Sequence, residues 1–268
     1  MDMDRMAQGF AFMSTLMENF GEAQDLNNED AQKYLEENIL NTPLSSDTFY
    51  ALMDLRKMAF TFSHGTESFF GIKELTFPYF FSQINEAYRE MFLTWGEAAY
   101  SAAYDPENRK LLQPLKQEYR TMLPVKNRAG EYYWLTQIAI PLQFDADRNL
   151  LTHLNVYRVG IAYEAWKNWA IKGEILENNL PRKDFAFTME EYVREYVSST
   201  FGKRKYQMLK LYASGTSTDD IAASFTISKK TLYTHNKDIL AKANKIFHRN
   251  FSTVKEAANS LQENGYLE

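Results

Sequence analysis

The sequence contains no cysteine and only four histidines. It also lacks any apolar run approaching the roughly 18 residues of a membrane-spanning helix. Without cysteine the chain cannot form disulfides, cysteine-based zinc or iron–sulfur sites, a thiol nucleophile or a flavin–cysteine adduct. The amino terminus, MDMDR, is acidic where a secretory signal peptide needs basic residues. These absences predict a soluble, cytoplasmic protein with no membrane partner.

Sequence signatures of catalysis are also missing. The chain has no glycine-rich phosphate loop, no Gly-x-Ser-x-Gly elbow and no cluster of residues with metal-ligand spacing. Acidic residues are plentiful but scattered, which is typical of a solvated surface. We therefore expect a protein that is not an enzyme, with no catalytic residues and no metal site.

The composition is that of a folded protein. Hydrophobic residues make up 45% of the 268 positions, and aromatic residues make up 15%. A chain of this length corresponds to about two domains of roughly 150 residues each. Wholesale disorder is therefore excluded.

The net charge of −5 conceals an uneven distribution along the chain. Residues 201–268 hold 11 basic and six acidic side chains, whereas the rest holds 19 basic and 29 acidic ones. The carboxy-terminal part therefore carries +5 and the remainder −10. A small basic module attached to an acidic body suggests a nucleic-acid-binding domain.

Residues 1–44 are predicted to form a helical segment. Apolar side chains recur there at alternating three- and four-residue steps, the spacing of one helical face: Met3, Met6, Phe10, Met13, Met17 and Phe20. The pattern fits packing on the chain's own domain and equally a dimer contact, so both interpretations stay open.

Residues 45–163 are predicted to form antiparallel strands with helices between them. Three successive strands are expected over about 119–125, 131–144 and 150–159, after a helical stretch at roughly 83–113. In the middle strand seven side chains are predicted to share one face at period two: Tyr132, Trp134, Thr136, Ile138, Ile140, Leu142 and Phe144. Gly130 suits a hairpin turn, and Pro141 predicts an edge position or a bulge.

This order resembles that of a PAS domain: two strands, a run of short helices, then a three-stranded meander. The resemblance covers about residues 45–163. It is carried by FTFSHGTESFFGI (60–72), YFFSQI (79–84) and the hairpin KNRAGEYYW (126–134). It implies a domain that senses a ligand, binds a cofactor or mediates dimerisation, and the fold does not choose among these roles.

The residues narrow the choice of cofactor for such a domain. Flavin and chromophore versions that need cysteine are excluded, and no histidine lies at 83–113, where a haem version would place one. His64, expected in a turn, and His153, expected in a strand, are interpreted as ordinary hydrogen-bonded or exposed side chains. No cofactor is identified. A cup that holds a small apolar ligand and a cup filled by aromatic rings remain alternatives.

Residues 164–199 are predicted to be a helical linker. Tyr163, Trp166 and Trp169 indicate an aromatic helical piece, and a break is expected near Pro181. A Thr three residues before a Glu, at 188 and 191, has the spacing of a capping box and predicts a helix that begins near residue 188.

Residues 200–268 are predicted to form a helical module. A first helix is expected over 203–213, with Gly215 after its end. Ser217 is predicted to cap a short second helix, and Ser228 a third that runs to about residue 245. Two short helices joined by a tight turn, the second one basic, are typical of a helix-turn-helix.

The third helix has two distinct faces. Leu232, Ile239 and Ala243 are predicted to pack against the second helix and the turn. The free face carries base, hydroxyl and aromatic groups: Lys230, Tyr233, Thr234 and Lys237, with Ala241. Lysine can neutralise phosphates or reach guanine acceptors, and hydroxyl groups can bond to base edges. This face is typical of a recognition helix.

The module resembles the LuxR-type helix-turn-helix. LKLYASGTSTDDIA (209–222), ISKKTLYTH (227–235) and ILAK (239–242) match its pattern in register, and residues 251–266 fit the fourth, dimerising helix of the family. The sequence departs from the family at Gln207, where a Glu is usual, and at Tyr233, where Lys is frequent. The second departure alters the expected base preference.

The resemblance implies which residues bind DNA. Lys230, Tyr233, Thr234 and Lys237 would face the major groove. Thr231 is a further member of the expected DNA-binding set. Five others are expected nearer the phosphates: Ser217, Thr218, Lys229, His235 and Lys242.

The sequence therefore predicts an α+β protein: a PAS-like antiparallel sheet with helices, followed by an all-α LuxR-type helix-turn-helix domain. The expected function is transcription regulation, with double-stranded DNA as partner and a homodimer as the active form. RNA polymerase or an upstream signalling protein is a further expected partner. The alternative is a signalling scaffold whose helix-turn-helix contacts a protein.

Overall fold

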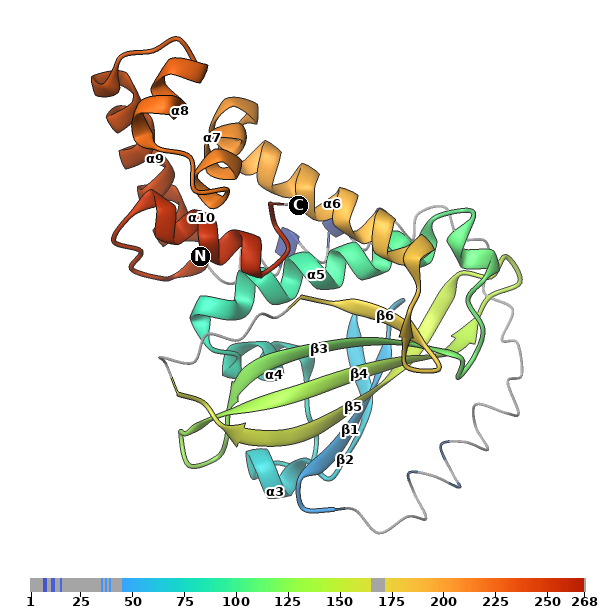
Figure 1. Cartoon of the computed structure of the whole chain (residues 1–268). Coiled ribbons are helices and arrows are strands. Elements are labelled where there is room, and N and C mark those ends of the chain that lie inside the picture. Colours follow the sequence, from blue (N-terminus) through green and yellow to red (C-terminus); the bar gives the residue numbers. More distant parts are fainter. Residues whose placement is uncertain are drawn as a thin grey trace.

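A seven-stranded antiparallel sheet with the order β2-β1-β5-β4-β3-β6-β7 forms the base of the computed structural model of the chain (Figure 1). The structure describes residues 45–164 and 172–267, together with Ala7, Gln8, Ala11, Phe12, Thr15, Leu35, Glu37 and Ile39. The strands are β1 (Thr48–Asp54), β2 (Ala59–His64), β3 (Gln117–Lys126), β4 (Tyr132–Phe144), β5 (Leu150–Ala162), β6 (Glu174–Glu177) and β7 (Leu180–Pro181).

The helices form layers on one side of this sheet. They are α3 (Thr66–Phe70), α4 (Phe77–Gln83), α5 (Glu86–Tyr104), α6 (Lys183–Phe201), α7 (Lys203–Ala213), α8 (Thr218–Ser224), α9 (Lys229–Phe247) and α10 (Val254–Glu263). In Figure 1, α5 crosses above the sheet, α6 lies along α5, and α7–α10 form a lobe at one end of this pair. No described helix is long and apolar enough to cross a membrane.

The mixed α+β class is confirmed, and the expected order of elements in the sheet domain is present. Two strands are followed by helices and then by the β3-β4-β5 meander. Gly130 has a φ of 84° in the β3–β4 turn, a conformation that favours glycine. His64 was expected in a turn but ends β2 instead, and the turn is made by Gly65, whose φ is 80°. The apolar stripe expected at residues 3–20 lies outside the described residues.

The prediction of one continuous apolar face on β4 is wrong, because β-bulges interrupt the alternation of its side chains. The pairing of β4 with β5 shifts next to Trp134 and again after Pro141, so the bulge expected at the proline is present. An extra residue reverses the face on which the following side chains lie. Trp134 and Phe144 therefore lie in the core beneath the helices, whereas Ile138 and Leu142 belong to a second cluster.

The segment at 164–199, predicted as a helical linker, contains a hairpin before its helix. β6 pairs with β3, and β7 with β6, so this segment extends the sheet by two strands. Asn178 and Asn179 make the turn with φ values of 51° and 62°, which Asn tolerates better than most residues. The helix begins at Lys183 and not near Thr188. Trp166 and Trp169 lie outside the described residues.

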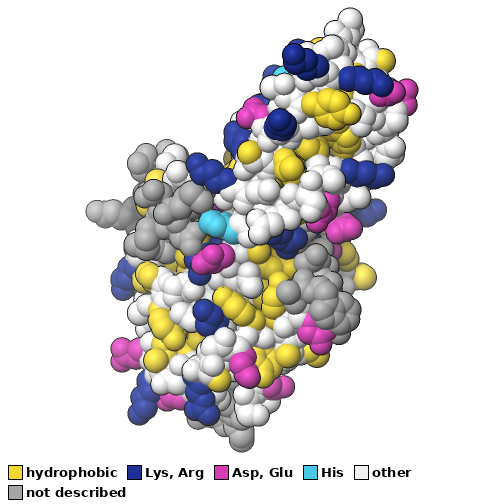
Figure 2. All heavy atoms as spheres, turned by 90° about the vertical axis from the view of Figure 1, so that its left-hand side faces the viewer, with side chains coloured by type: hydrophobic (Ala, Val, Ile, Leu, Met, Phe, Trp, Pro, Cys, Tyr) yellow, Lys and Arg dark blue, Asp and Glu magenta, His cyan; other side chains and the backbone are white. Residues whose placement is uncertain are grey.

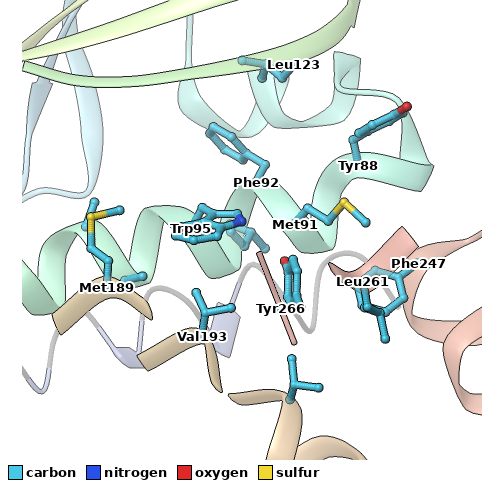
Figure 3. Packing of buried hydrophobic residues seen from close by; sticks show 14 of the residues in the cluster. Tyr88, Met91, Phe92, Trp95, Leu123, Met189, Val193, Phe247, Leu261 and Tyr266 are labelled. Carbon is cyan, nitrogen blue, oxygen red and sulfur yellow. The ribbon is translucent and has the colours of Figure 1, made fainter. Parts of the chain in front are cut away.

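One buried core runs from the sheet through α5 and α6 into the carboxy-terminal module. Figure 3 shows side chains of this core, with residues from α5, α6, α9 and α10 facing one another. Helix α6 contributes a stripe at three- and four-residue steps: Phe185, Met189, Val193, Val197 and Phe201. Its Tyr192 hydroxyl donates to Glu97 of α5 at 3.0 Å, and its Tyr196 hydroxyl bonds to Glu90. α6 is therefore part of the core and not a loose connector.

This burial predicts different costs for two aromatic residues of α6. Phe185 is 0% exposed and Phe187 is 65% exposed. Phe185→Ala should lower the free energy of unfolding by about 3–5 kcal/mol, because it leaves a cavity in a packed core. Phe187→Ala should change it by less than about 0.5 kcal/mol. Urea unfolding measures both values, and equal costs would show that α6 is not packed as described.

Candidate nucleic-acid interface and a neighbouring cavity

The ends of the helices in the carboxy-terminal module are fixed by local hydrogen bonds. Ser217 accepts a hydrogen bond from the backbone N–H of Asp220 at 3.2 Å and so caps α8. Ser228 accepts one from the N–H of Thr231 at 3.1 Å and caps α9. Gly215, after α7, has a φ of 83°. The three predicted boundaries are confirmed, because each depends on a residue type with a strong local preference.

The inner face of α9 holds this helix against α7 and α8. Leu232, Ile239 and Ala243 are all 0% exposed, as expected from their spacing. Asn236, one turn after Leu232, donates its amide hydrogen to the Tyr212 hydroxyl of α7 at 2.6 Å. This contact was not predicted from the sequence, although Asn236 lies on the same helical face as the apolar residues. The inner face thereby fixes which side of α9 is free.

The outer face of α9 is open to solvent. Lys230, Tyr233, Thr234 and Lys237 are all exposed, and 57% of Tyr233 is accessible. Their spacing of three and four residues places them on one side of the helix. Figure 2 shows several Lys and Arg side chains on the projecting lobe that contains α8 and α9. The structure thus brings together the four residues expected to face a DNA groove.

Two other basic residues of the expected set have partners within the chain. Lys229 lies 2.8 Å from the carboxylate of Asp219 on α8, and this hydrogen bond raises the pKa of Lys229. The ammonium group of Lys242 bonds to the carbonyl oxygen of Thr200 at the end of α6. Both lysines remain exposed at their surface. Lys230 and Lys237 have no ion-pair partner among the described residues.

The expected polar residues near the start of α8 are surrounded by acid. Ser217 Oγ donates to the carboxylate of Asp220 at 2.6 Å, and Asp219 lies in the same turn beside Thr218. Carboxylates repel phosphate, so the phosphate-facing role of this turn is the weakest part of the expected set. On α9, Thr231 bonds to the Ser228 hydroxyl at 2.9 Å, and His235 is half-buried.

The last helix uses its apolar face within the chain. Val254, Ala257, Ala258 and Leu261 of α10 are buried, and α10 packs against α7 and α9. The side of α10 that faces solvent is polar: Lys255, Glu256, Asn259, Gln262 and Glu263. A contact between two copies through this helix would therefore use polar side chains.

A cavity of about 120 Å³ lies between the sheet and α5. Apolar residues line most of it, including Met53, Phe92, Ala139 and Tyr157. Polar side chains from three strands also reach it: Gln117 and Tyr119 of β3, Gln137 of β4, and His153 and Asn155 of β5. This polar group was not predicted from the sequence. In the sequence, the only sign of this group is that Gln137 of β4 and His153 and Asn155 of β5 occupy positions between the apolar ones.

The polar lining is only partly satisfied. The amide of Gln137 donates to Asn155 at 2.8 Å, and Asn155 donates to the backbone of Ala51 at 3.3 Å. His153 Nε2 lies 2.8 Å from the Tyr100 hydroxyl, so the interpretation of His153 as a hydrogen-bonded residue is confirmed. Gln137 Oε1 and His153 Nδ1 are buried and lack a hydrogen-bond partner among the residues that the structure describes. Such atoms carry a cost that a ligand or water can remove.

Burial sets the protonation of these groups. It lowers the pKa of His153 to about 4 and raises the pKa of Tyr100. Both side chains are therefore neutral at pH 7. Among the described residues, no group of three or more His, Asp and Glu side chains could hold a metal ion.

Residues 199–245 match the family model described as bacterial regulatory proteins, luxR family. Among solved structures, the chain is similar to the one titled "Crystal structure of the phage VqmA-DPO complex", with 12% identity and a TM-score of 0.28 over 90% of this chain and 92% of that one. No curated protein sequence matches the chain.

The depressed pKa of His153 predicts a loss of stability in acid. Between about pH 6.5 and 4 the unfolded chain binds a proton that the folded chain excludes. The contribution of neutral His153 to the free energy of unfolding is therefore complete above pH 6.5. The free energy of unfolding falls by about 3 kcal/mol as the pH approaches 4. In urea unfolding across this range, His153→Gln should remove that part of the pH dependence. An unchanged pH dependence in the variant would contradict the assignment.

Proposed function

We propose, from the premise that residues 199–245 form a LuxR-family helix-turn-helix domain, that the chain is a sequence-specific transcription regulator. In this proposal α9 binds in the major groove of duplex DNA. The preceding sheet domain is PAS-like and senses a small ligand. The observation that carries the DNA-binding part is the free outer face of α9, with Lys230, Tyr233, Thr234 and Lys237 side by side.

The chemistry of this face supports groove binding. Lys230 and Lys237 are exposed cations without ion-pair partners among the described residues, so phosphate or guanine oxygens can approach them without breaking an ion pair. Tyr233 presents a hydroxyl and a ring, and a face that served only for solubility would not need an aromatic residue that is 57% exposed. Lys229, Thr231, His235 and Lys242 flank this face and are proposed as its outer contacts, with Ser217 and Thr218 at its edge.

A homodimer is the proposed active form. One recognition helix reads only a few base pairs, and two copies bound to half-sites about one helical turn apart double the contact. The polar exposed side of α10 and the apolar residues at the amino terminus are candidate surfaces for this pairing.

The sensing part of the proposal is supported by the cavity. Its volume of about 120 Å³ is somewhat below the roughly 150 Å³ of an engineered cavity that holds one benzene molecule. This volume supports a cup that holds a ligand over one filled by its own aromatic rings, and the proposed ligand is no larger than about one ring. His153 and Tyr100 are neutral, and the carboxylate of Glu97, which also lines the cavity, already accepts the hydrogen bond of Tyr192. A charged ligand would lose its hydration without full compensation, so a neutral ligand fits the lining better. The proposed ligand is neutral and hydrogen-bonds to Gln137 Oε1 or His153 Nδ1.

Lys237→Ala tests the DNA-binding face. The variant should bind specific duplex DNA more weakly, and its log–log salt slope should be smaller in magnitude by about 0.9, because each phosphate contact releases about that many counterions. Gel-shift titrations at several salt concentrations give both values. Lys183→Ala, an exposed lysine at the start of α6, is the matched control and should leave both unchanged.

An unchanged affinity and slope in Lys237→Ala would remove α9 from the DNA interface. Failure of the intact chain to retard any promoter fragment would favour the alternative function, a scaffold whose helix-turn-helix binds a protein. The free basic face favours DNA.

Ala139→Leu tests the cavity. Ala139 lines the cavity, and a larger side chain would occupy the space of the ligand. Native mass spectrometry of the wild-type chain after incubation with extract of its host cells should show a bound small molecule that the variant lacks. Ala129→Leu, in the exposed β3–β4 turn, is the control and should retain the molecule. Equal occupancy in both variants would place the ligand elsewhere.

A further inference from the structure

Three consecutive residues of α5 take part in three different contacts. Trp95 donates a hydrogen bond from Nε1 to the backbone of Asn264 at 3.2 Å. Gly96 lines the cavity, and Glu97 accepts the hydrogen bond of Tyr192 from α6. A movement of this single helical turn therefore changes the carboxy-terminal end, the cavity and α6 together.

Residues 264–267, which we call the latch, close the contact between α5 and the carboxy-terminal module. The Tyr266 ring packs edge-on against the Trp95 ring, with centroids 6.3 Å apart, and against the Phe247 ring at 5.8 Å. Tyr266 is 0% exposed and Leu267 is 4% exposed. Figure 3 shows Tyr266 between Trp95 on one side and Phe247 and Leu261 on the other. Phe247 is the last residue of α9, so the latch joins α5 to the helix that is proposed to read DNA.

The latch packs closely against Trp95 at Gly265. Gly265 has a φ of 75°, and a Cβ atom there would lie 2.9 Å from Cζ2 of Trp95. Trp95 itself is 1% exposed. Close-packed interiors transmit displacement and do not absorb it, and tight interfaces tend to be either formed or broken. At Gly96, by contrast, a Cβ atom would meet no other atom within 4 Å, so the free space lies on the cavity side of the same turn.

We propose that the latch couples the cavity to the DNA-reading module: filling the cavity beside Gly96 moves the Trp95 turn and releases residues 264–267 from α5. The effect of this coupling on DNA binding rests on the proposed function. With the latch closed, α9 is held at a fixed orientation to the sheet domain. When the latch opens, that orientation is lost and the spacing between the half-sites of a dimer is no longer fixed.

Hydrogen exchange of the intact chain without DNA tests the coupling. Gly96→Leu and Ala139→Leu fill the cavity from opposite walls, one from α5 and one from β4. Both should increase the exchange rate of the peptide that covers 261–267 by a factor of about 5 to 150, the usual range of coupling between two sites. Gly265→Ala, which breaks the latch directly, gives the reference rate for an open latch. Ala129→Leu should exchange as the wild type does.

Each outcome decides the proposal. Wild-type exchange of this peptide in both cavity variants overturns it. Faster exchange in Gly96→Leu alone also overturns it, since the effect would then belong to α5 and not to cavity filling. Protection of β4 and β5 must match the wild type, which shows that the variant is folded. Ala139→Val, which adds less volume to the cavity than leucine does, serves if the leucine variants unfold and should show a smaller change of the same sign.

The assay contains no DNA, so its result is independent of the proposed function. If the exchange changes as expected but the chain binds no DNA, the coupling proposal stands and transcription regulation is contradicted. If the chain binds DNA but the exchange does not change, transcription regulation stands and the coupling proposal is contradicted.

Discussion

The burial of α5 is the contact on which the rest of the structure depends. One face of this helix closes the cavity over the sheet, another receives α6, and a third carries Tyr88, Met91 and Trp95 toward the carboxy-terminal module. Arg249 of the module lies over the Tyr88 ring at 4.7 Å and adds a cation–π contact at the same seam. The sheet domain, the segment at 164–199 and the carboxy-terminal module therefore share one continuous core in the described residues, and the module packs directly on α5.

Local features of the module could be read from the sequence because each one depends on nearby residues. Ser217 and Ser228 cap helices through their own side chains, and Gly215 allows a left-handed turn. The apolar spacing of α9 identified its inner face, and the outer face followed by elimination. Lys242 was assigned to phosphate, yet it bonds to the carbonyl oxygen of Thr200, a contact made across 42 residues that no local pattern encodes.

Features that depend on long-range packing could not be predicted. Bulges beside Trp134 and Pro141 reverse the faces of β4, and a bulge is set by the pairing with β5 and not by the alternation in β4 itself. The β6–β7 hairpin was missed because its residues acquire strand pairing only from β3. The polar lining of the cavity, with Gln137 and His153, was missed because these residues become neighbours only when β4 and β5 pair beneath α5.

The function proposed for this chain depends on the free face of α9 reading a DNA sequence in a dimer. Selection of bound sites from random duplex DNA with the purified intact chain tests it most directly. We expect enrichment of an inverted repeat whose half-sites lie about one helical turn, roughly 10 base pairs, or a multiple of it apart. Recovery of duplexes with no shared motif, at an affinity set only by salt, would contradict it.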